Sequence, residues 1–322
     1  MDLTQCQTMG PILPPGRLAY GIQLPVQAQS SIFVEPWEAA AGAAELATIA
    51  SAAEDAGFAY VAVCDHVAVP RPLDEPMGTT WYDTVATLGY LAAVTARITL
   101  LSHVYVLAHR HPLATAKAFA TLDALSGGRM VLGVGAGHVG AEFELLGTDY
   151  ANRGKLLDEA IDAVRSAFTH EYPTVDGPTW SFADAGQRPR PVRPGGPPIW
   201  VGGSSRSALR RAAERGDGWL PQGTTMAEMP DQIAYVRAHR RATVGDWPIV
   251  LGAIAPPIHV GEPAWDVGGH TLSGPPAKIA HVLGKYRAMG VDQVQVRFRN
   301  RSLAELLDQM CAFGADVAPR LA

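Results

Sequence analysis

The sequence predicts a single (β/α)8 barrel, in which eight parallel strands each lead into a helix. Eight short apolar runs alternate with eight stretches of helical periodicity, and each run has a helix after it. The run 130–134 is apolar without alternation, as expected of a parallel strand that is buried on both faces. A length of 322 residues fits one large barrel or two ordinary domains. The regular alternation favours the barrel; an open doubly wound sheet is the alternative, because strand order cannot be read from a sequence.

The predicted elements follow in order along the chain. The strands are 18–24, 60–64, 98–104, 130–134, 199–201, 218–220, 249–260 and 293–298. The helices are 37–56, 83–93, one opened by His111 and Pro112, 152–168, 205–215, 226–243, 276–289 and 303–318. The segment 172–185 has the turn Asp176–Gly177 between extended runs, which predicts a hairpin insertion in the barrel.

Two regions are predicted along the chain. Residues 1–16 are expected to form a flexible N-terminal tail, because prolines and glycines follow a polar start. Residues 17–322 are expected to form the barrel domain.

Composition excludes several function classes. The net charge is -5 and the isoelectric point is about 6.0, so no basic surface for nucleic acid is expected. Cys6, Cys64 and Cys311 have no paired spacing, and no His/Asp pair has the helical spacing of a metal site, so neither disulfides nor a metal are expected. No leader-like start or membrane-length apolar run is present. We therefore expect a soluble cytoplasmic protein.

The stretch 125–147 joins a turn, a buried strand and a glycine-rich loop. Gly133, Gly135 and Gly137 predict a bare backbone at the strand end, which a flat ring or an anion could approach. A tight turn without a ligand is the alternative interpretation. The dinucleotide-binding fingerprint fits poorly, because no acidic residue ends a second strand about twenty residues further on.

In a barrel the active site lies at the carboxyl ends of the strands. The candidate rim residues are those just after each apolar run: Gln23, Asp65 with His66, Ser102 with His103, 136–140 and 202–205. Gly202, Gly203, Ser204 and Ser205 open a helix, so they could hold a phosphate or could only cap that helix.

His66 and His138 are the candidate catalytic residues, because each can move a proton near neutral pH. A packed core histidine is the alternative for each, and Asp65 could orient His66 or cap the loop. No serine elbow, nucleophilic cysteine context or Walker loop is present. These features indicate that a bound organic cofactor supplies the reactivity.

Several segments together resemble the bacterial luciferase-like monooxygenase superfamily. They are VAVCDHVAVP (61–70), 109–147, NRGKLLDEAI (152–161), 197–219 and 272–298. Within the superfamily, the DH-x-x-x-P loop and the RHP segment look most like the branch that uses the deazaflavin coenzyme F420.

The resemblance implies a cofactor ring across the barrel mouth and a phosphate near 202–205. The implied cofactor-binding residues are Asp65, His66, Ser102, His103, Val104, Ala136, Gly137, His138, Gly202, Gly203, Ser204 and Ser205. His138 departs from relatives, which often have a bulky aromatic residue or a carboxylate there. The resemblance also implies a cis peptide between His103 and Val104, and structural ion pairs at Arg129, Arg153 and Glu159.

The function expected from the resemblance is hydride transfer between coenzyme F420 and a small apolar organic substrate. An FMN-dependent monooxygenase that uses reduced flavin and dioxygen is the alternative, and a barrel that binds a cofactor or ligand without turnover is a third. Loops 69–80, 172–193 and 256–271 are expected to line the substrate pocket. A homodimer is expected from the resemblance, together with many alanine-rich helix faces.

Overall fold

The computed structural model describes residues 12–14, 16–31, 33–71 and 73–321. Eight parallel strands pair in the order β3-β2-β1-β13-β10-β9-β8-β5, and pairing of β3 with β5 closes the barrel. The strands are β1 (Ala19–Gln23), β2 (Tyr60–Val63), β3 (Thr99–Ser102), β5 (Met130–Gly135), β8 (Ile199–Gly202), β9 (Gly218–Leu220), β10 (Val250–Ile254) and β13 (Gln293–Val296). The predicted (β/α)8 barrel is confirmed, and the open sheet is excluded.

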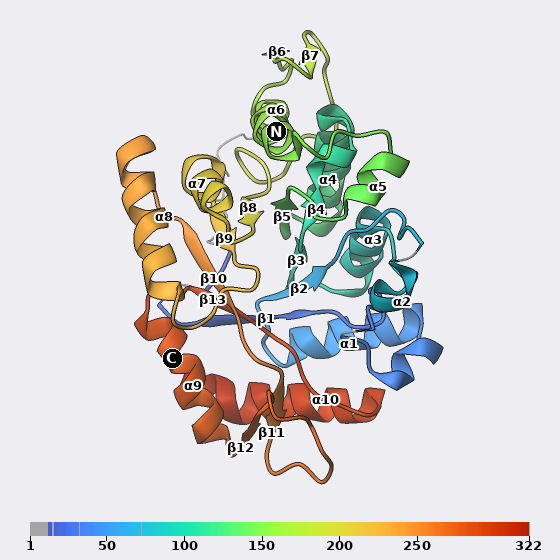
Figure 1. Cartoon of the computed structure of the whole chain (residues 1–322), viewed down its shortest axis with the longest axis vertical. Coiled ribbons are helices and arrows are strands. Elements are labelled where there is room, and N and C mark those ends of the chain that lie inside the picture. The colour runs from blue at the N-terminus through green and yellow to red at the C-terminus, as the bar shows by residue number, and fades with distance from the viewer. Residues whose placement is uncertain (1–11, 15, 32, 72, 322) are drawn as a thin grey trace, which may run out of the picture.

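Helices surround the strands (Figure 1). They are α1 (Ala43–Asp55), α3 (Thr84–Val94), α4 (Pro112–Ser126), α6 (Arg153–Thr169), α7 (Arg206–Arg215), α8 (Met229–Thr243), α9 (Pro276–Ala288) and α10 (Leu303–Ala312), with the short α2 (Asp74–Met77) and α5 (Gly140–Leu145) in loops. The predicted helix 37–56 is divided: Pro36–Ala40 form a 3-10 turn, and α1 begins only after Gly42. Gly42 is extended, and its N–H donates to the Glu45 side chain as a helix cap.

Inside the barrel, glycines make room for large side chains from neighbouring strands. A Cβ atom at Gly21 would collide with the Tyr60 ring, and one at Gly218 would collide with the Trp200 ring. The Tyr60 hydroxyl donates to Gln293 Oε1 at 2.5 Å within this interior. The lower part of the barrel is therefore a packed core rather than a channel.

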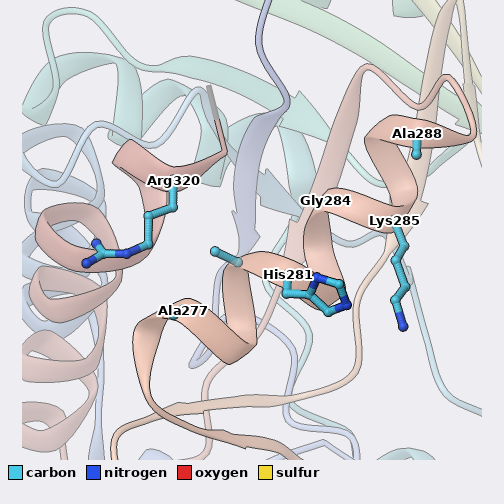
Figure 2. Close-up of a pocket in the computed structure, with 7 residues that line it drawn as sticks. Ala277, His281, Gly284, Lys285, Ala288 and Arg320 are labelled. Atoms are coloured by element: carbon cyan, nitrogen blue, oxygen red, sulfur yellow. The ribbon is translucent and has the colours of Figure 1, made fainter.

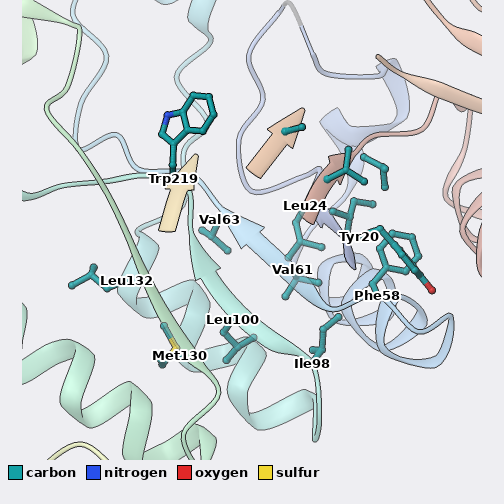
Figure 3. Packing of buried hydrophobic residues seen from close by; sticks show 14 of the residues in the cluster. Tyr20, Leu24, Phe58, Val61, Val63, Ile98, Leu100, Met130, Leu132 and Trp219 are labelled. Atoms are coloured by element: carbon teal, nitrogen blue, oxygen red, sulfur yellow. The ribbon is translucent and has the colours of Figure 1, made fainter. Parts of the chain in front are cut away.

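A second apolar layer lies between the strands and the helices. Val61, Val63, Leu100 and Leu132 point outward from β2, β3 and β5 and are fully buried in one cluster (Figure 3). Full burial of each such side chain contributes roughly 1.5–3 kcal/mol. Strands covered on both faces explain why the runs in the sequence are continuously apolar.

Two excursions leave the barrel. Strands β6 (Val175–Asp176) and β7 (Ser181–Phe182) pair antiparallel beyond α6, which confirms the predicted hairpin (Figure 1). The predicted strand 249–260 is wrong in its second half. Pro256 and Pro257 interrupt it, and β11 (Ile258–Val260) pairs with β12 (Leu272–Gly274) in a separate sheet. The predicted strand 98–104 is longer than the observed β3, which ends at Ser102, and a separate short strand β4 (Tyr105–Val106) follows it.

The chain before β1 closes the lower end of the barrel. Leu13 is 8% exposed and packs in the interior cluster with Tyr60 and Trp200. The packed fold therefore begins by residue 12, inside the predicted tail. Residues 1–11 and 15 of that tail, Cys6 included, lie outside the described residues.

Two features are absent from the described residues. No helix among them is long and apolar enough to cross a membrane. In the same part of the chain, no group of three or more His, Cys, Asp or Glu residues could hold a metal ion.

Candidate active site

The closed parallel barrel brings four predicted segments to one rim. Asp65 follows β2, His103 follows β3, Gly137 follows β5 and Gly203 follows β8. Because all these strands are parallel, their carboxyl ends share one mouth. The predicted site residues therefore lie on the same face of the barrel.

The Asp65 side chain forms hydrogen bonds with neighbouring protein groups. It is buried, and its carboxylate accepts two hydrogen bonds from Arg110 at 2.6 and 2.8 Å. The backbone N–H of Val106 donates to it at 2.8 Å and the Thr84 hydroxyl at 3.0 Å. Asp65 therefore anchors the loop after β2. Its alternative predicted role, orienting His66, is performed by another carboxylate.

That carboxylate is Glu142, on α5. Its Oε2 lies 2.9 Å from His66 Nδ1, and its Oε1 accepts the backbone N–H groups of Val67 and Ala68 at 2.7 and 3.1 Å. The Glu142 side chain is only 2% exposed. Burial alone would raise its pKa, but the hydrogen bonds from His66 and the backbone lower it to about 2. Glu142 is therefore ionised at neutral pH and fixes one nitrogen of His66.

Sequence reasoning missed Glu142, although it lies within the stretch 125–147. A second missed residue, His109, has its Nε2 4.0 Å from Glu142 Oε2 on the side away from solvent. Its side chain is 2% exposed, and burial lowers its pKa. Its Nδ1 lies 3.4 Å from the Thr148 hydroxyl. The carboxylate thus lies between two histidines, of which His66 is nearer the rim.

The two candidate catalytic histidines are neighbours. The rings of His66 and His138 are 5.7 Å apart and nearly perpendicular, and Trp81 packs edge-on against His66 at 4.5 Å. His138 is exposed at the rim. Partial burial of its ring lowers its pKa, and the nearby His66 lowers it further. Both side chains are therefore placed to move a proton at the barrel mouth.

The glycines of the rim pack against protein atoms. Gly133 lies against the carbonyl oxygen of Ser102, and the Val104 side chain covers both Gly135 and Gly202. Gly137 is likewise covered, by the ring of Phe143. Close packing therefore explains why these positions are glycine, and the approach of a ligand to the backbone here stays a prediction.

The end of β3 is held rigidly. The Ser102 hydroxyl donates to the Gly133 carbonyl at 2.9 Å, and the His103–Val104 peptide is cis, as predicted. His103 is buried, which lowers its pKa to about 4, so its ring is neutral at neutral pH. His103 Nε2 lies 3.2 Å from the Gln222 amide nitrogen, while His103 Nδ1 is buried without a partner among the described residues.

The segment 202–205 combines capping with unused donors. Ser205 Oγ caps α7 by accepting the Ala208 N–H at 3.3 Å, and Ser204 Oγ accepts the Gln222 N–H at 2.9 Å. The Gly203 N–H is already bonded to a carbonyl oxygen on β9. Within the described chain, the N–H groups of 204, 206 and 207 have no acceptor. These donors at a helix N-terminus fit a phosphate.

The expected ion pairs at Arg129, Arg153 and Glu159 are absent from the described part of the chain. Arg129 instead donates to backbone carbonyls, including those of Ala92, Thr95 and Ile98. Glu159 accepts the backbone N–H groups of the hairpin residues 179 and 180 at 2.8 Å each. Arg153 donates to the Gly137 carbonyl at 3.2 Å. Arg153 therefore supports the loop that carries His138.

Two surface hollows lie away from this mouth. One of about 490 Å3 lies along α9 and is lined by Ala277, His281, Lys285 and Arg320 among others (Figure 2). The other, of about 860 Å3, lies between α1 and the C-terminal segment. Neither is lined by a rim residue. The chemistry of the rim, rather than the size of a hollow, identifies the candidate site.

A model of the family described as luciferase-like monooxygenase matches residues 24–263. The chain belongs to this family. The match includes six of the eight barrel strands, from β2 to β10, and each rim segment from Asp65 to Ser205. Membership of this family, with its F420-dependent oxidoreductase relatives, makes the chain an oxidoreductase, and the rim of the barrel is its candidate active site.

Three similar proteins illustrate the relationship. An uncharacterized protein of Mycobacterium tuberculosis is 35% identical over 204 residues, which are 60% of this chain and 70% of that protein. The F420-dependent glucose-6-phosphate dehydrogenase of Beutenbergia cavernae is 37% identical over 173 residues, 52% of this chain and 49% of that enzyme. The crystal structure of the monooxygenase RslO1 from Streptomyces bottropensis has a TM-score of 0.80 at 20% identity, covering 95% of this chain and 100% of that chain.

Proposed function

We propose that this protein transfers a hydride between coenzyme F420 and a small organic substrate. The observation that carries the proposal is the pair His66–Glu142, a histidine at the rim held at 2.9 Å by a buried, ionised carboxylate. Such a pair manages protons but supplies no redox chemistry, so a cofactor is required. The F420 dependence of the Beutenbergia cavernae relative supports deazaflavin as that cofactor.

The residues of the rim fit a deazaflavin. The unused N–H groups at the start of α7, with Gly202, Gly203, Ser204 and Ser205 around them, would hold a phosphate. The segments Asp65–His66, Ser102–Val104 and 136–138 would surround the ring. This group would supply the hydride chemistry, at a carbon of its ring.

His66 is the residue that we assign to the proton. Its Nδ1 is fixed by Glu142, which leaves Nε2 to accept a proton from the substrate in one direction and to return it in the other. The negative charge of Glu142 stabilises the imidazolium that forms. His138, 5.7 Å away between ring centres, would shape the same pocket or relay the proton to solvent.

An FMN-dependent monooxygenase is the second candidate function. The matching family is described as luciferase-like monooxygenase, and the phosphate cradle at 202–205 serves either cofactor equally well. The two cofactors differ in the reduced state, since reduced FMN reacts with dioxygen whereas reduced deazaflavin is nearly inert to it.

Two titrations followed by oxygen exposure test the proposal. Purified protein should bind F420 with micromolar or tighter affinity and FMN at least tenfold more weakly. Tighter binding of FMN, or dioxygen consumption coupled to substrate oxygenation, would establish the monooxygenase instead. Cofactor binding with no turnover of any substrate would favour a carrier or sensor.

A further inference from the structure

A ring of polar side chains lines the top of the barrel interior. Side chains two residues apart along a strand point to the same face, so the positions above the packed interior also face inward. At the mouth six of these positions carry polar side chains, and we call these six the polar ring: Gln23, Cys64, His103, Gln222, Gln295 and Arg297.

Hydrogen bonds link most of the polar ring. Gln295 Nε2 donates to Gln23 Oε1 at 3.1 Å, and Gln23 Nε2 donates to the Cys64 sulfur at 2.8 Å. Gln222 lies 3.2 Å from His103 on the opposite arc. Below them, Tyr60 and Trp200 are fully buried in the apolar interior. The interior thus changes from apolar to polar at its open end.

The polar ring is incompletely paired. Gln295 and His103 are only 6% and 7% exposed, yet Gln295 Oε1 and His103 Nδ1 make no hydrogen bond to any described residue. Gln295 opposes the burial that lowers the His103 pKa, so the two unpaired atoms belong to neighbouring side chains. An unpaired buried polar atom destabilises the folded protein, so two in one ring indicate a place where a ligand supplies partners.

Arg297 adds a positive charge to this ring. Its guanidinium stacks on the Phe33 ring at 4.6 Å, and it forms no hydrogen bond or ion pair within the described part of the chain. The nearby carboxylates are already engaged: Glu38 accepts the backbone N–H of Val26 at 2.8 Å, and Glu35 pairs with Arg299 at 3.0 Å. The donors of Arg297 are therefore held in one plane and unused.

The strand order places Arg297 across the mouth from the phosphate cradle. Strand β13, which Arg297 follows, is separated from β8 by β9 and β10. On its other side β13 pairs with β1, and β1 pairs with β2, which leads to His66. A molecule between His66 and Arg297 would thus occupy the wall opposite the cradle.

We propose that the polar ring binds the substrate and that Arg297 pairs with an oxyanion on it, a carboxylate or a phosphate. A guanidinium that is stacked and planar suits the two oxygens of such a group. Gln295 and His103 would bond to a polar group of the same molecule. The inference rests on the proposed function, because it takes the bound molecule to be the substrate of that reaction. It replaces the apolar substrate expected from the loops by an anionic one.

Calorimetric titration of wild type and Arg297→Met tests this inference. The probes are lactate, its neutral amide lactamide, and inorganic phosphate; phosphate is titrated with F420 already bound, so that the cradle is filled. We expect the wild type to bind at least one oxyanion tenfold or more tightly than lactamide. Lactate against phosphate distinguishes the two oxyanions. Arg297→Met should lose this preference, and Arg297→Lys, which keeps the charge without the planar fork, should retain part of it.

Arg241→Met is the matched control, since Arg241 is an exposed arginine on α8 and its loss removes the same charge. It should bind all probes as the wild type does. Equal oxyanion binding by wild type and Arg297→Met, or no oxyanion binding by the wild type, would overturn the inference. Weaker F420 binding in Arg297→Met, with lactate binding unchanged, would assign the arginine to the cofactor and also overturn it. If F420 does not bind at all, the proposed function fails, while the lactate titrations still test the ring.

Discussion

Glu142 Oε2 lies 2.9 Å from His66 Nδ1, although the two residues are 76 positions apart in the chain. The same carboxylate fastens the backbone at Val67 and Ala68. One side chain thus orients both the imidazole and the loop that carries it.

We predict that Glu142→Gln lowers turnover by about tenfold or more. The amide has one accepting oxygen, whereas the carboxylate accepts from an imidazole and two backbone N–H groups through two oxygens. Its NH2 group would face a backbone donor. Steady-state kinetics with F420 measure the effect, and Glu144→Gln, an exposed residue on the same helix, is the control. Equal losses in the two variants would argue against a specific role for Glu142.

Acid should weaken the fold partly through Glu142. Its pKa is lowered from 4.5 to about 2, so its contribution to stability is complete above the unfolded value and is lost as the pH falls from about 4.5 to 2. The shift corresponds to roughly 3 kcal/mol. Denaturant unfolding between pH 6 and pH 3 should therefore show a smaller loss of stability in Glu142→Gln than in wild type. Parallel curves for the two proteins would contradict this.

Histidine substitutions should separate the two rim histidines. His66→Ala is expected to lower turnover by roughly a hundredfold, the usual scale for loss of a general acid or base. His138→Ala should lower it by less than tenfold, because no carboxylate fixes that exposed ring. Single-turnover rates with bound F420 measure both. Unchanged rates in both variants would mean that the proton comes from solvent or from the substrate.

Asp65→Asn should lower the stability of the folded protein, in addition to any effect on its chemistry. Asp65 is 2% exposed in its side chain and pairs with Arg110 at 2.6 Å, so the variant leaves a partly buried arginine without its counter-ion. Loss of one partner from such a pair costs roughly 3–5 kcal/mol. Thermal unfolding should show a clear drop, and Asp55→Asn, whose side chain is 76% exposed, should show almost none.

We predict a homodimer in solution. The prediction rests on the family resemblance and on helix faces rich in small residues, such as the face of α9 that carries Ala277, Gly284 and Ala288 (Figure 2). Sedimentation at micromolar concentration should give about twice the 34.1 kDa of one chain. A species of one chain only would contradict the prediction.

The barrel was predictable because its signals are local. Each strand is a short apolar run, and each helix has its own periodicity. The errors have local causes as well: Pro256 and Pro257 divide a predicted strand, and Gly42 delays a helix. Both signals were present in the sequence, but prolines and glycines are so frequent here that they did not stand out.

The site was predictable in part. The rim segments follow from strand ends, so Asp65, His66 and His138 could be placed together. Their hydrogen-bond partners could not, because pairing depends on which side chains meet across the mouth. Arg110 and Glu142 come from other loops, and no spacing in the sequence links either to the residue it holds.

Leu13, Tyr60 and Trp200 seal the barrel from below. A molecule that reaches the polar side chains above them must therefore enter and leave through the same mouth of the barrel. A cofactor held on the side of the phosphate cradle would leave the opposite side of the mouth as the path for a second molecule. Substrate and product would then exchange along one path, because the lower end of the barrel offers no second exit.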